Sequence, residues 1–208
     1  MTDKTRLFDV LISALLLLLL APLLLLVAIT IKLTSIGPII YAQKRVGRHN
    51  TDFLMFKFRT MRVNAEKHGQ LTIGGRDNRI TTVGYYLRKF KFDELPQLIN
   101  VLKGEMSLVG PRPEVRKYVN LYTPEQMFIL TTRPGITDNA SLKYRNENEL
   151  LANVPNPEEY YIKVIMPDKI KLNKHYIYNK TLKSYFFAIF TTVFAVFNPQ
   201  VSFDEKVK

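Results

Sequence analysis

The stretch Leu7–Ile31, with the sequence LFDVLISALLLLLLAPLLLLVAITI, decides the architecture of the chain. It carries one formal charge, at Asp9, and is otherwise apolar on every side. A helix without a polar face is typical of a segment surrounded by lipid. As a straight helix it would be about 38 Å long, enough to cross a hydrocarbon layer of about 30 Å. The sequence therefore predicts a membrane-embedded helix.

Pro22 leaves two topologies open for this helix. Proline lacks the N–H that would bond to the carbonyl of Leu18, and its ring favours a kink there. The arms on either side would be about 22 Å and about 14 Å long, and neither alone crosses the layer. Positive residues favour the cytoplasmic side and occur on both flanks, as at Arg6 and Lys32. A re-entrant helix satisfies both flanks, and a single-pass helix with a tolerated kink is the alternative.

The remainder of the chain is strongly basic. The 208 residues include 30 Lys and Arg against 18 Asp and Glu, a net charge of +12, and all 30 basic residues lie outside Leu7–Ile31. Such a surface suits anionic lipids and phosphorylated ligands. The absence of cysteine excludes a disulfide framework, a thiolate nucleophile and a thiolate metal site.

After the apolar helix, the pattern predicts an α+β fold that is mainly α-helical with a small β-hairpin. Short apolar runs at Ile39–Tyr41 and Phe53–Phe58 flank a turn. On the second strand Lys57 and Arg59 share one face. That face is either a solvated edge or a surface that meets phosphate groups.

Several helices are predicted after the hairpin. One is capped by Thr81 or Thr82 and runs to about Phe90. A second begins at Asp93 and ends at Gly104. Further helices are expected at Glu147–Asn153, Glu158–Ile165, Lys169–Lys180 and Tyr185–Phe197. The last is too short to span a membrane and suits an interfacial or buried helix.

The candidate chemistry begins with two adjacent carboxylates, Asp93 and Glu94. Adjacent residues on a helix point about 100° apart, so the two can act on different atoms of one ligand. One carboxylate can attack phosphorus and form an acyl phosphate, while its neighbour holds Mg²⁺. The simpler alternative is that both complement the helix dipole.

Arginine side chains surround this pair in the sequence. Arg112 stands between Pro111 and Pro113, which fix its backbone. A guanidinium presented in this way suits bidentate contacts with phosphate, and a surface salt bridge is the alternative. Arg88 precedes the acidic pair and Arg145 follows later in the chain.

Three motifs stand out in the sequence. The longest is FDELPQLINVLKGEMSLVGPRPE at Phe92–Glu114, and the others are KFRTM at Lys57–Met61 and RPGIT at Arg133–Thr137. Together they resemble a known family, the bacterial sugar transferases, or monotopic phosphoglycosyl transferases. The resemblance extends from residue 4 to about residue 190. The string from Phe92 is long and specific.

The resemblance implies an enzyme on the cytoplasmic face of the bacterial inner membrane. Such enzymes move a phosphosugar from a UDP-sugar donor to polyprenyl (undecaprenyl) phosphate and release UMP, as the first membrane step of glycan assembly. By this resemblance Asp93 is the nucleophile that forms a covalent phosphosugar intermediate, and Glu94 binds Mg²⁺. The substrate-binding residues implied by the motifs are Arg88, Arg112, Arg145, Lys57, Arg59, Pro111 and Pro113.

Two departures from the family pattern stand out. The family's re-entrant helix bends at a Ser-Pro pair, and this chain has Ala21-Pro22. After RPGIT many members continue with Gly-Leu and a Gln, whereas this chain has Asp138–Ser141, which we interpret as a change near the sugar or lipid subsite. The expected organisation is a re-entrant membrane helix at 1–36, a cytosolic membrane-associated catalytic domain at 37–197 and a loose tail at 198–208.

Two other functions compete with the transferase. The net charge of +12 also suits a membrane-tethered basic binding module that recruits nucleic acid or acidic proteins without turnover. The intact acidic pair argues against nucleic acid as a partner, because carboxylates repel phosphodiesters. A structural scaffold for glycan assembly is the third option. The sequence does not specify the sugar, the pathway or the oligomeric state, and a homo-oligomer stays open.

Overall fold

The computed structural model describes residues 4–65, 71–74 and 77–198 of the chain. Most of the tail expected at 198–208 lies outside the described residues. The helices are α1 (Arg6–Thr34), α2 (Thr82–Lys89), α3 (Gln97–Lys103), α4 (Arg116–Val119), α5 (Asn139–Lys143), α6 (Glu147–Ala152), α7 (Pro157–Tyr160), α8 (Met166–Tyr178) and α9 (Leu182–Phe197). The strands are β1 (Ile40–Val46), β2 (Asp52–Phe58), β3 (Ser107–Val109) and β4 (Gly135–Thr137). The expected α+β class, mainly helical with a small hairpin, is confirmed.

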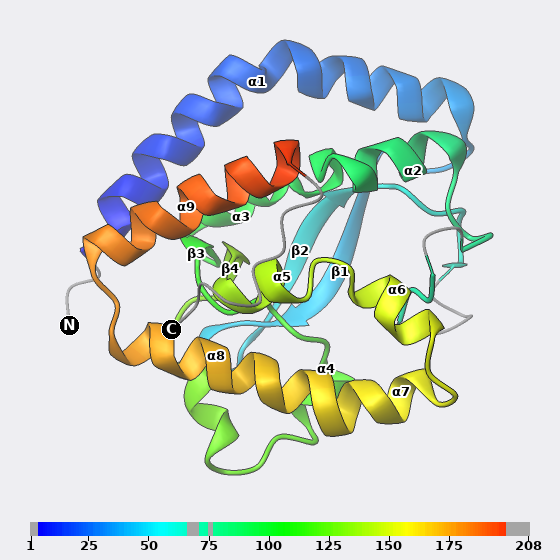
Figure 1. The fold of residues 1–208 in the computed structure, drawn as a ribbon. Coiled ribbons are helices and arrows are strands. Elements are labelled where there is room, and N and C mark those ends of the chain that lie inside the picture. The colour runs from blue at the N-terminus through cyan, green and yellow to red at the C-terminus, as the bar shows by residue number, and fades with distance from the viewer. Residues whose placement is uncertain (1–3, 66–70, 75–76, 199–208) are drawn as a thin grey trace.

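The apolar segment forms one long helix, α1, which arches along the edge of the molecule (Figure 1). By length and composition it could cross a membrane, and little of it is buried against the protein. Pro22 lies inside the helix, in the middle part of its sequence. Leucines such as Leu18, which is 74% exposed, point away from the protein. Such exposure is expected for a helix that contacts lipid on the sides that the protein does not cover.

The first turns of α1 are fastened to the rest of the protein by polar contacts. The guanidinium of Arg6 donates to the carbonyls of Val101 (2.7 Å) and Leu102 (3.1 Å) at the end of α3, where cations also complement the helix dipole. The carboxylate of Asp9 is fully buried and accepts hydrogen bonds from Ser107, the Leu108 amide and the Tyr185 hydroxyl. Asp9 therefore joins α1 to β3 and α9.

The other end of α1 is held by the same domain. Val27 and Ile31 pack with Phe58 of β2 and Leu87 of α2. The guanidinium of Arg59 donates to the carbonyl and hydroxyl oxygens of Ser35, both at 2.8 Å, just beyond the helix. Both ends of α1 thus contact one body.

The predicted hairpin is present as β1 and β2, which pair antiparallel from Ile40–Phe58 to Val46–Asp52. Asn100 of α3 fastens this hairpin to the centre of the molecule. Its side chain accepts from the Phe56 amide (2.9 Å) and donates to the Leu54 carbonyl (2.7 Å). Because these bonds satisfy polar groups in a buried position, they fix α3 against β2.

A second, parallel pair of strands was missed by the sequence analysis. β3 and β4 pair at Ser107–Gly135 and Val109–Thr137. Gly135 allows the two backbones to meet, since a Cβ there would lie 2.1 Å from the Gly110 amide nitrogen. The short α5, which follows β4, was also not predicted. Strands of three residues give too little periodicity to be recognised.

Two predicted helix boundaries are wrong. The helix expected to begin at Asp93 begins at Gln97, and residues Phe92–Glu94 form a 3₁₀ turn before it. The chain enters the helix through i→i+3 bonds, such as the bond from the Leu98 amide to the Leu95 carbonyl at 3.0 Å. The helices expected at Glu158–Ile165 and Lys169–Lys180 run together, because a π-helical turn at Tyr161–Ile165 joins α7 to α8.

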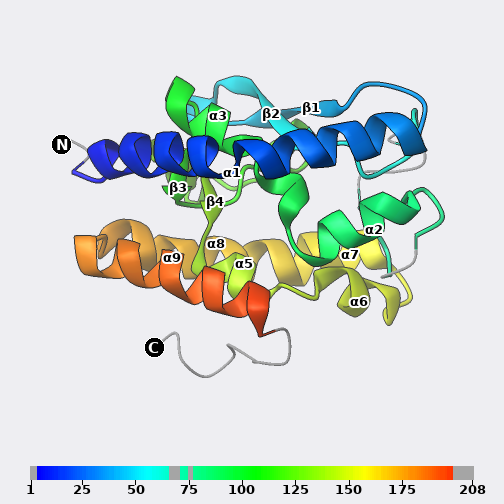
Figure 2. The same ribbon diagram turned by 90° about the horizontal axis from the view of Figure 1, so that it is seen from above.

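The aromatic helix α9 lies toward the same side of the molecule as α1 (Figure 2). The rings of Phe8 in α1 and Phe186 in α9 meet edge to face, with centroids 5.2 Å apart. Tyr185 and Ala188 face the core, whereas Phe190 is 72% exposed. The helix therefore has one face on the protein and one apolar face without protein cover among the described residues, as an interfacial helix would.

Candidate active site

A tight turn places the two carboxylates at the centre of the site. Lys91 has a left-handed backbone with φ of 58°, and the 3₁₀ turn follows directly. Successive residues in such a turn point about 120° apart, so Asp93 and Glu94 meet different surroundings. Both side chains are largely buried.

Glu94 is held by two cations. The guanidinium of Arg112 binds both carboxylate oxygens, with Nη1 3.2 Å from Oε2 and Nη2 on Oε1. The ammonium of Lys57 on β2 lies 3.0 Å from Oε1. Burial alone would raise the pKa of Glu94, but the charges of Arg112 and Lys57 outweigh burial and hold this pKa well below its usual value. Glu94 is therefore ionised.

Asp93 lacks such partners. It is 5% exposed, and its Oδ1 has no hydrogen-bond partner among the described residues. Burial raises the pKa of Asp93 and the charge of Glu94 adds to the increase, although Lys57, Lys91 and Arg88 oppose it. A pair of titratable groups whose pKa values are pushed apart is typical of active sites.

Lys57 is the cation that acts on both carboxylates. The pKa of its ammonium is lowered to about 8, mainly by burial. Arg112 and Arg45 add to the decrease, whereas the charges of Glu94 and Asp93 oppose it. The side chain comes from the second strand of the hairpin, as the sequence predicted. Its contact with Glu94 shows that this face of the strand meets the site rather than solvent.

The Pro-Arg-Pro loop (Pro111–Pro113) carries Arg112 to Glu94. The carbonyl of Pro111 accepts from the Gly135 amide at 2.9 Å, and that of Pro113 accepts from the Arg45 guanidinium at 3.0 Å. The Arg112 amide donates to the carboxylate of Asp138 at 2.7 Å. A cavity of about 20 Å³, near the size of one water, lies beside the loop. The loop is therefore held at each of its three residues.

Arg88 lies near the acidic pair, because the charges of Asp93 and Glu94 both act on its guanidinium. Its Nε donates to the Thr60 hydroxyl at 3.0 Å and its Nη1 to the Thr72 hydroxyl at 3.4 Å. Burial lowers the pKa of Arg88, while the charge of Asp93 opposes the shift. Gly84 lets α2 approach this point, because a Cβ there would lie 2.0 Å from the Thr60 carbonyl oxygen. Arg88 therefore faces Asp93 without being tied to a carboxylate by any contact in the described part of the chain.

Two predicted substrate-binding residues lie elsewhere. Arg59 is buried at the end of α1, where it binds Ser35. Arg145 donates to the carbonyl of Ala195 in α9 at 3.0 Å. Within the described residues, neither makes a hydrogen bond or ion pair with Asp93 or Glu94. The structure thus brings Lys57, Arg88 and Arg112 to the acidic pair, and their roles toward substrate stay predictions.

The acidic pair Asp93 and Glu94 fits a magnesium site in which substrate supplies some of the ligands. No group of three or more acidic or histidine side chains that could hold a metal occurs among the described residues. Magnesium is commonly bound by one or two carboxylates while substrate phosphates and waters complete its shell. Glu94, with Asp93 beside it, matches that donor set.

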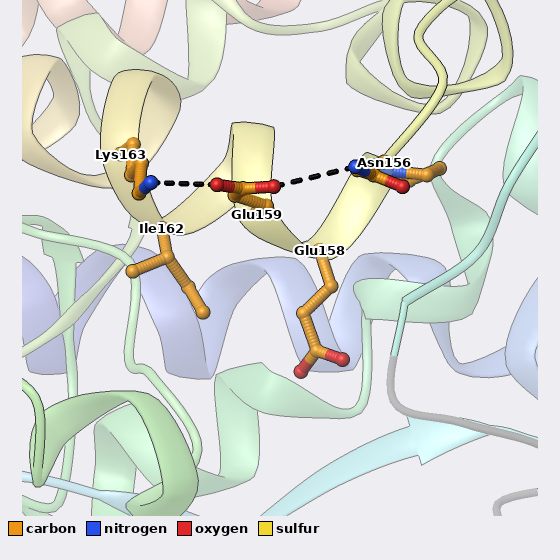
Figure 3. Close-up of a pocket in the computed structure, with 6 residues that line it drawn as sticks. Asn156, Glu158, Glu159, Ile162 and Lys163 are labelled. Atoms are coloured by element: carbon orange, nitrogen blue, oxygen red, sulfur yellow. Dashed lines mark hydrogen bonds and ion pairs between the residues drawn. The ribbon is translucent and has the colours of Figure 1, made fainter.

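A larger open hollow, of about 520 Å³, lies on α7 (Figure 3). Its polar groups bond to each other, with Lys163 2.6 Å from Glu159 and Asn156 3.3 Å from the same carboxylate. Glu158 points away from them and binds Lys117. Surface pairs of this kind contribute little free energy, and the hollow offers no unpaired charge for chemistry.

Sequence reasoning missed two residues that support the site, Arg45 and Asp138. From the sequence, Arg45 is only one of the basic residues outside the apolar helix, and nothing there indicates a role at the site. Asp138 was assigned to a change near the sugar or lipid subsite, and the structure places it on the amide of Arg112. The spacing of Asp138 and Ser141 is an N-cap signal that could have predicted α5. Its bond to a loop 26 residues away has no local signal.

Comparison with known proteins identifies the family of the chain. The model of one family, described as bacterial sugar transferase, matches residues 3–199. The chain belongs to the bacterial sugar transferases. This membership confirms the resemblance found in the three motifs.

Three similar proteins align with different shares of this chain. ExoY of Sinorhizobium fredii, an exopolysaccharide production protein, is 35% identical over 92% of this chain and 84% of its own length. The UDP-N-acetylgalactosamine-undecaprenyl-phosphate N-acetylgalactosaminephosphotransferase of Aeromonas hydrophila is 46% identical over 62% of this chain. The UDP-glucose:undecaprenyl-phosphate glucose-1-phosphate transferase of Caulobacter vibrioides is 43% identical over 67%. The matched region spans only 31% and 54% of the last two relatives.

The opposite pKa shifts predict opposite effects on stability. The Asp93→Asn variant should be more stable than the wild type at pH 7, by about 1 to 3 kcal/mol, because it removes a buried carboxylate without partners. Folding raises the pKa of Asp93. The wild type therefore loses stability as the pH rises from the pKa of Asp93 in the unfolded chain to its higher pKa in the folded protein. The difference should vanish below about pH 4. Thermal unfolding in detergent at several pH values measures it.

The Glu94→Gln variant is the matched comparison. It should be less stable than the wild type at pH 7, because Lys57 and Arg112 lose their counter-charge. Folding lowers the pKa of Glu94, so its contribution is present above the unfolded value and is lost as pH falls through the folded one. A less stable Asp93→Asn or a more stable Glu94→Gln protein would contradict the assignment of charges.

Proposed function

We propose that the chain is a phosphoglycosyl transferase that moves a phosphosugar from a UDP-sugar to polyprenyl phosphate and releases UMP. The observation that carries the proposal is the unequal acidic pair, in which Glu94 is neutralised by Lys57 and Arg112 while Asp93 keeps an unpaired oxygen. Family membership and the names of the relatives support the reaction class.

The first step uses Asp93 as the nucleophile. A carboxylate oxygen of Asp93 attacks the phosphorus that bears the sugar, and the bond from this phosphorus to the UMP oxygen breaks. The products are an aspartyl phosphosugar and UMP, which carries the displaced negative charge. Arg88 and Arg112 lie beside the pair and suit the phosphate oxygens of the donor.

The second step returns the enzyme to its starting state. An oxygen of polyprenyl phosphate attacks the phosphorus of the adduct, and the bond to Asp93 breaks. The product is a polyprenyl diphosphate sugar, and the carboxylate of Asp93 is free again. Two displacements divide one difficult transfer between two bulky anions into two steps.

Magnesium would be held by Glu94 and the diphosphate oxygens of the donor, and it would neutralise charge on the leaving UMP. Lys57 and Arg112 fix the orientation of Glu94 for that purpose. Because both cations already reduce the charge of Glu94, substrate oxygens would be needed to complete a stable metal site.

The acceptor is dissolved in a membrane, and the exposed apolar surface suits such a partner. Helices α1 and α9 lie toward the same side of the molecule (Figure 2). Both carry exposed apolar side chains, such as Leu18 of α1 and Phe187 and Phe190 of α9. Burying such side chains in lipid gains about 25 cal/mol per Å². We propose that this side dips into the cytoplasmic leaflet of the inner membrane and sets the depth of the active site.

The contacts at both ends of α1 support a re-entrant helix. Arg6 and Asp9 bind the domain at one end, and Ser35 binds it through Arg59 at the other. A spanning helix would have to release one set of contacts, because its ends would be separated by about 30 Å of hydrocarbon. The cost would include exposing the fully buried carboxylate of Asp9 or the paired guanidinium of Arg59.

Release of UMP tests the reaction. Purified protein is screened with a panel of UDP-sugars, undecaprenyl phosphate and Mg²⁺. We expect Asp93→Asn to lower the rate at least about a thousand-fold and Glu94→Gln about a hundred-fold. An Asp168→Asn variant, altered in an aspartate that binds Lys143 and Tyr144, serves as the control and should keep the wild-type rate. Full activity of Asp93→Asn, or absence of UMP release with every donor, would overturn the proposal.

Labelling of single cysteines tests the topology. The chain has no cysteine, so Lys4→Cys and Ile36→Cys each introduce one reactive thiol at an end of α1. A re-entrant helix predicts that a membrane-impermeant reagent labels both from the cytoplasmic side, while Leu18→Cys, surrounded by lipid, stays unlabelled. Labelling of the two ends from opposite sides would show a spanning helix.

A further inference from the structure

Asp138 occupies the junction between β4 and α5, and it is 1% exposed. Its two carboxylate oxygens serve different parts of the chain. Oδ1 accepts the Ser141 amide and caps α5, whereas Oδ2 accepts the Arg112 amide at 2.7 Å. One oxygen is therefore used for local structure and the other for the Pro-Arg-Pro loop.

The Arg112 amide has a particular need for an acceptor. Pro111 and Pro113 carry no N–H, so the amide of Arg112 is the one backbone donor in these three residues. A buried donor without a partner is costly, and an ionised acceptor makes the stronger bond. Asp138 supplies that acceptor.

This bond lies at the opposite end of Arg112 from its bond to Glu94. The amide is fixed by Asp138, and the guanidinium meets both oxygens of Glu94. Bidentate geometry tolerates little displacement, since a shift of about 1 Å at the backbone would break one of the two bonds. The position of Glu94 therefore depends on the backbone that Asp138 holds.

We propose that Asp138 is a positioning residue that acts through Arg112 on the acidic pair. The inference rests on the proposed function, since its effect on rate is an effect on phosphosugar transfer. Asp138 touches neither Asp93 nor Glu94 by any hydrogen bond in the described part of the chain, and its influence passes through one backbone amide.

The first measurement needs no turnover. Hydrogen exchange at the Arg112 amide reports the bond directly, because no other amide lies between Gly110 and Glu114. Full-length protein in detergent is compared as wild type, Asp138→Ser and Asp168→Asn. Serine can still cap α5 but is too short to serve both amides. We expect exchange about ten- to a hundred-fold faster at Arg112 in Asp138→Ser, and unchanged exchange in Asp168→Asn.

Asp168 is a suitable control because its partly exposed carboxylate also supports the end of α5. It binds Lys143 at 2.8 Å and the Tyr144 hydroxyl at 2.7 Å, without contact to the Pro-Arg-Pro loop. Its variant loosens the α5 region while it leaves the Arg112 amide bond in place.

The second measurement is UMP release in a double-mutant cycle with Arg112→Lys. Asp138→Ser should lower the rate about ten- to a hundred-fold in the wild-type background and by less than about three-fold in Arg112→Lys, because the contact it supports is already lost. A residue that only stabilised α5 would have the same effect in both backgrounds.

The outcomes separate the two proposals. Wild-type exchange at Arg112 in Asp138→Ser overturns the inference, and so does faster exchange without a change in UMP release. An equal loss of rate in both backgrounds also overturns it. If the wild type releases no UMP with any donor, the proposed function fails, while the exchange result still decides whether Asp138 holds Arg112.

Discussion

The carboxylate of Glu94, held between Lys57 and Arg112, is the interaction on which the candidate site depends. Two adjacent carboxylates in a buried place would repel each other and resist ionisation. The two cations stabilise the ionised form of Glu94 alone, and Asp93 keeps an unpaired oxygen. The asymmetry follows from the 3₁₀ turn, which points neighbouring side chains in different directions. One residue can then bind while the other reacts.

The rest of the fold brings these groups together and joins them to the apolar helix. Lys57 comes from the hairpin, Arg112 from the loop after β3, and Asp138 from the end of β4. The same β3 strand contacts Asp9 of α1 through its Ser107 hydroxyl and Leu108 amide. The apolar helix α1 and the turn that carries Asp93 and Glu94 are therefore joined through the same body, which suits the proposed reaction between a soluble donor and a lipid-bound acceptor.

Local patterns predicted much of this structure. The apolar helix, the hairpin, the cap at Thr81 and the acidic pair all follow from residues close in sequence, and the motif at Phe92–Glu114 indicated the family. What the sequence did not predict depends on distant contacts. The pairing of β3 with β4 and the bond from Arg112 to Asp138 join segments more than 20 residues apart. The start of α3 differs from the prediction because a 3₁₀ turn at Phe92–Glu94 precedes the helix, and the capping preference of Asp93 does not distinguish the two.

The central claim is that Asp93, and not Glu94, becomes covalently attached to the donor phosphorus. Mass spectrometry of protein mixed with a UDP-sugar donor and Mg²⁺, without acceptor, and quenched within seconds, tests it most directly. The account predicts an added phosphosugar mass on the peptide that contains Asp93, absent from Asp93→Asn and discharged by undecaprenyl phosphate. Turnover by protein that never carries this adduct, or an adduct located on Glu94, would contradict the account.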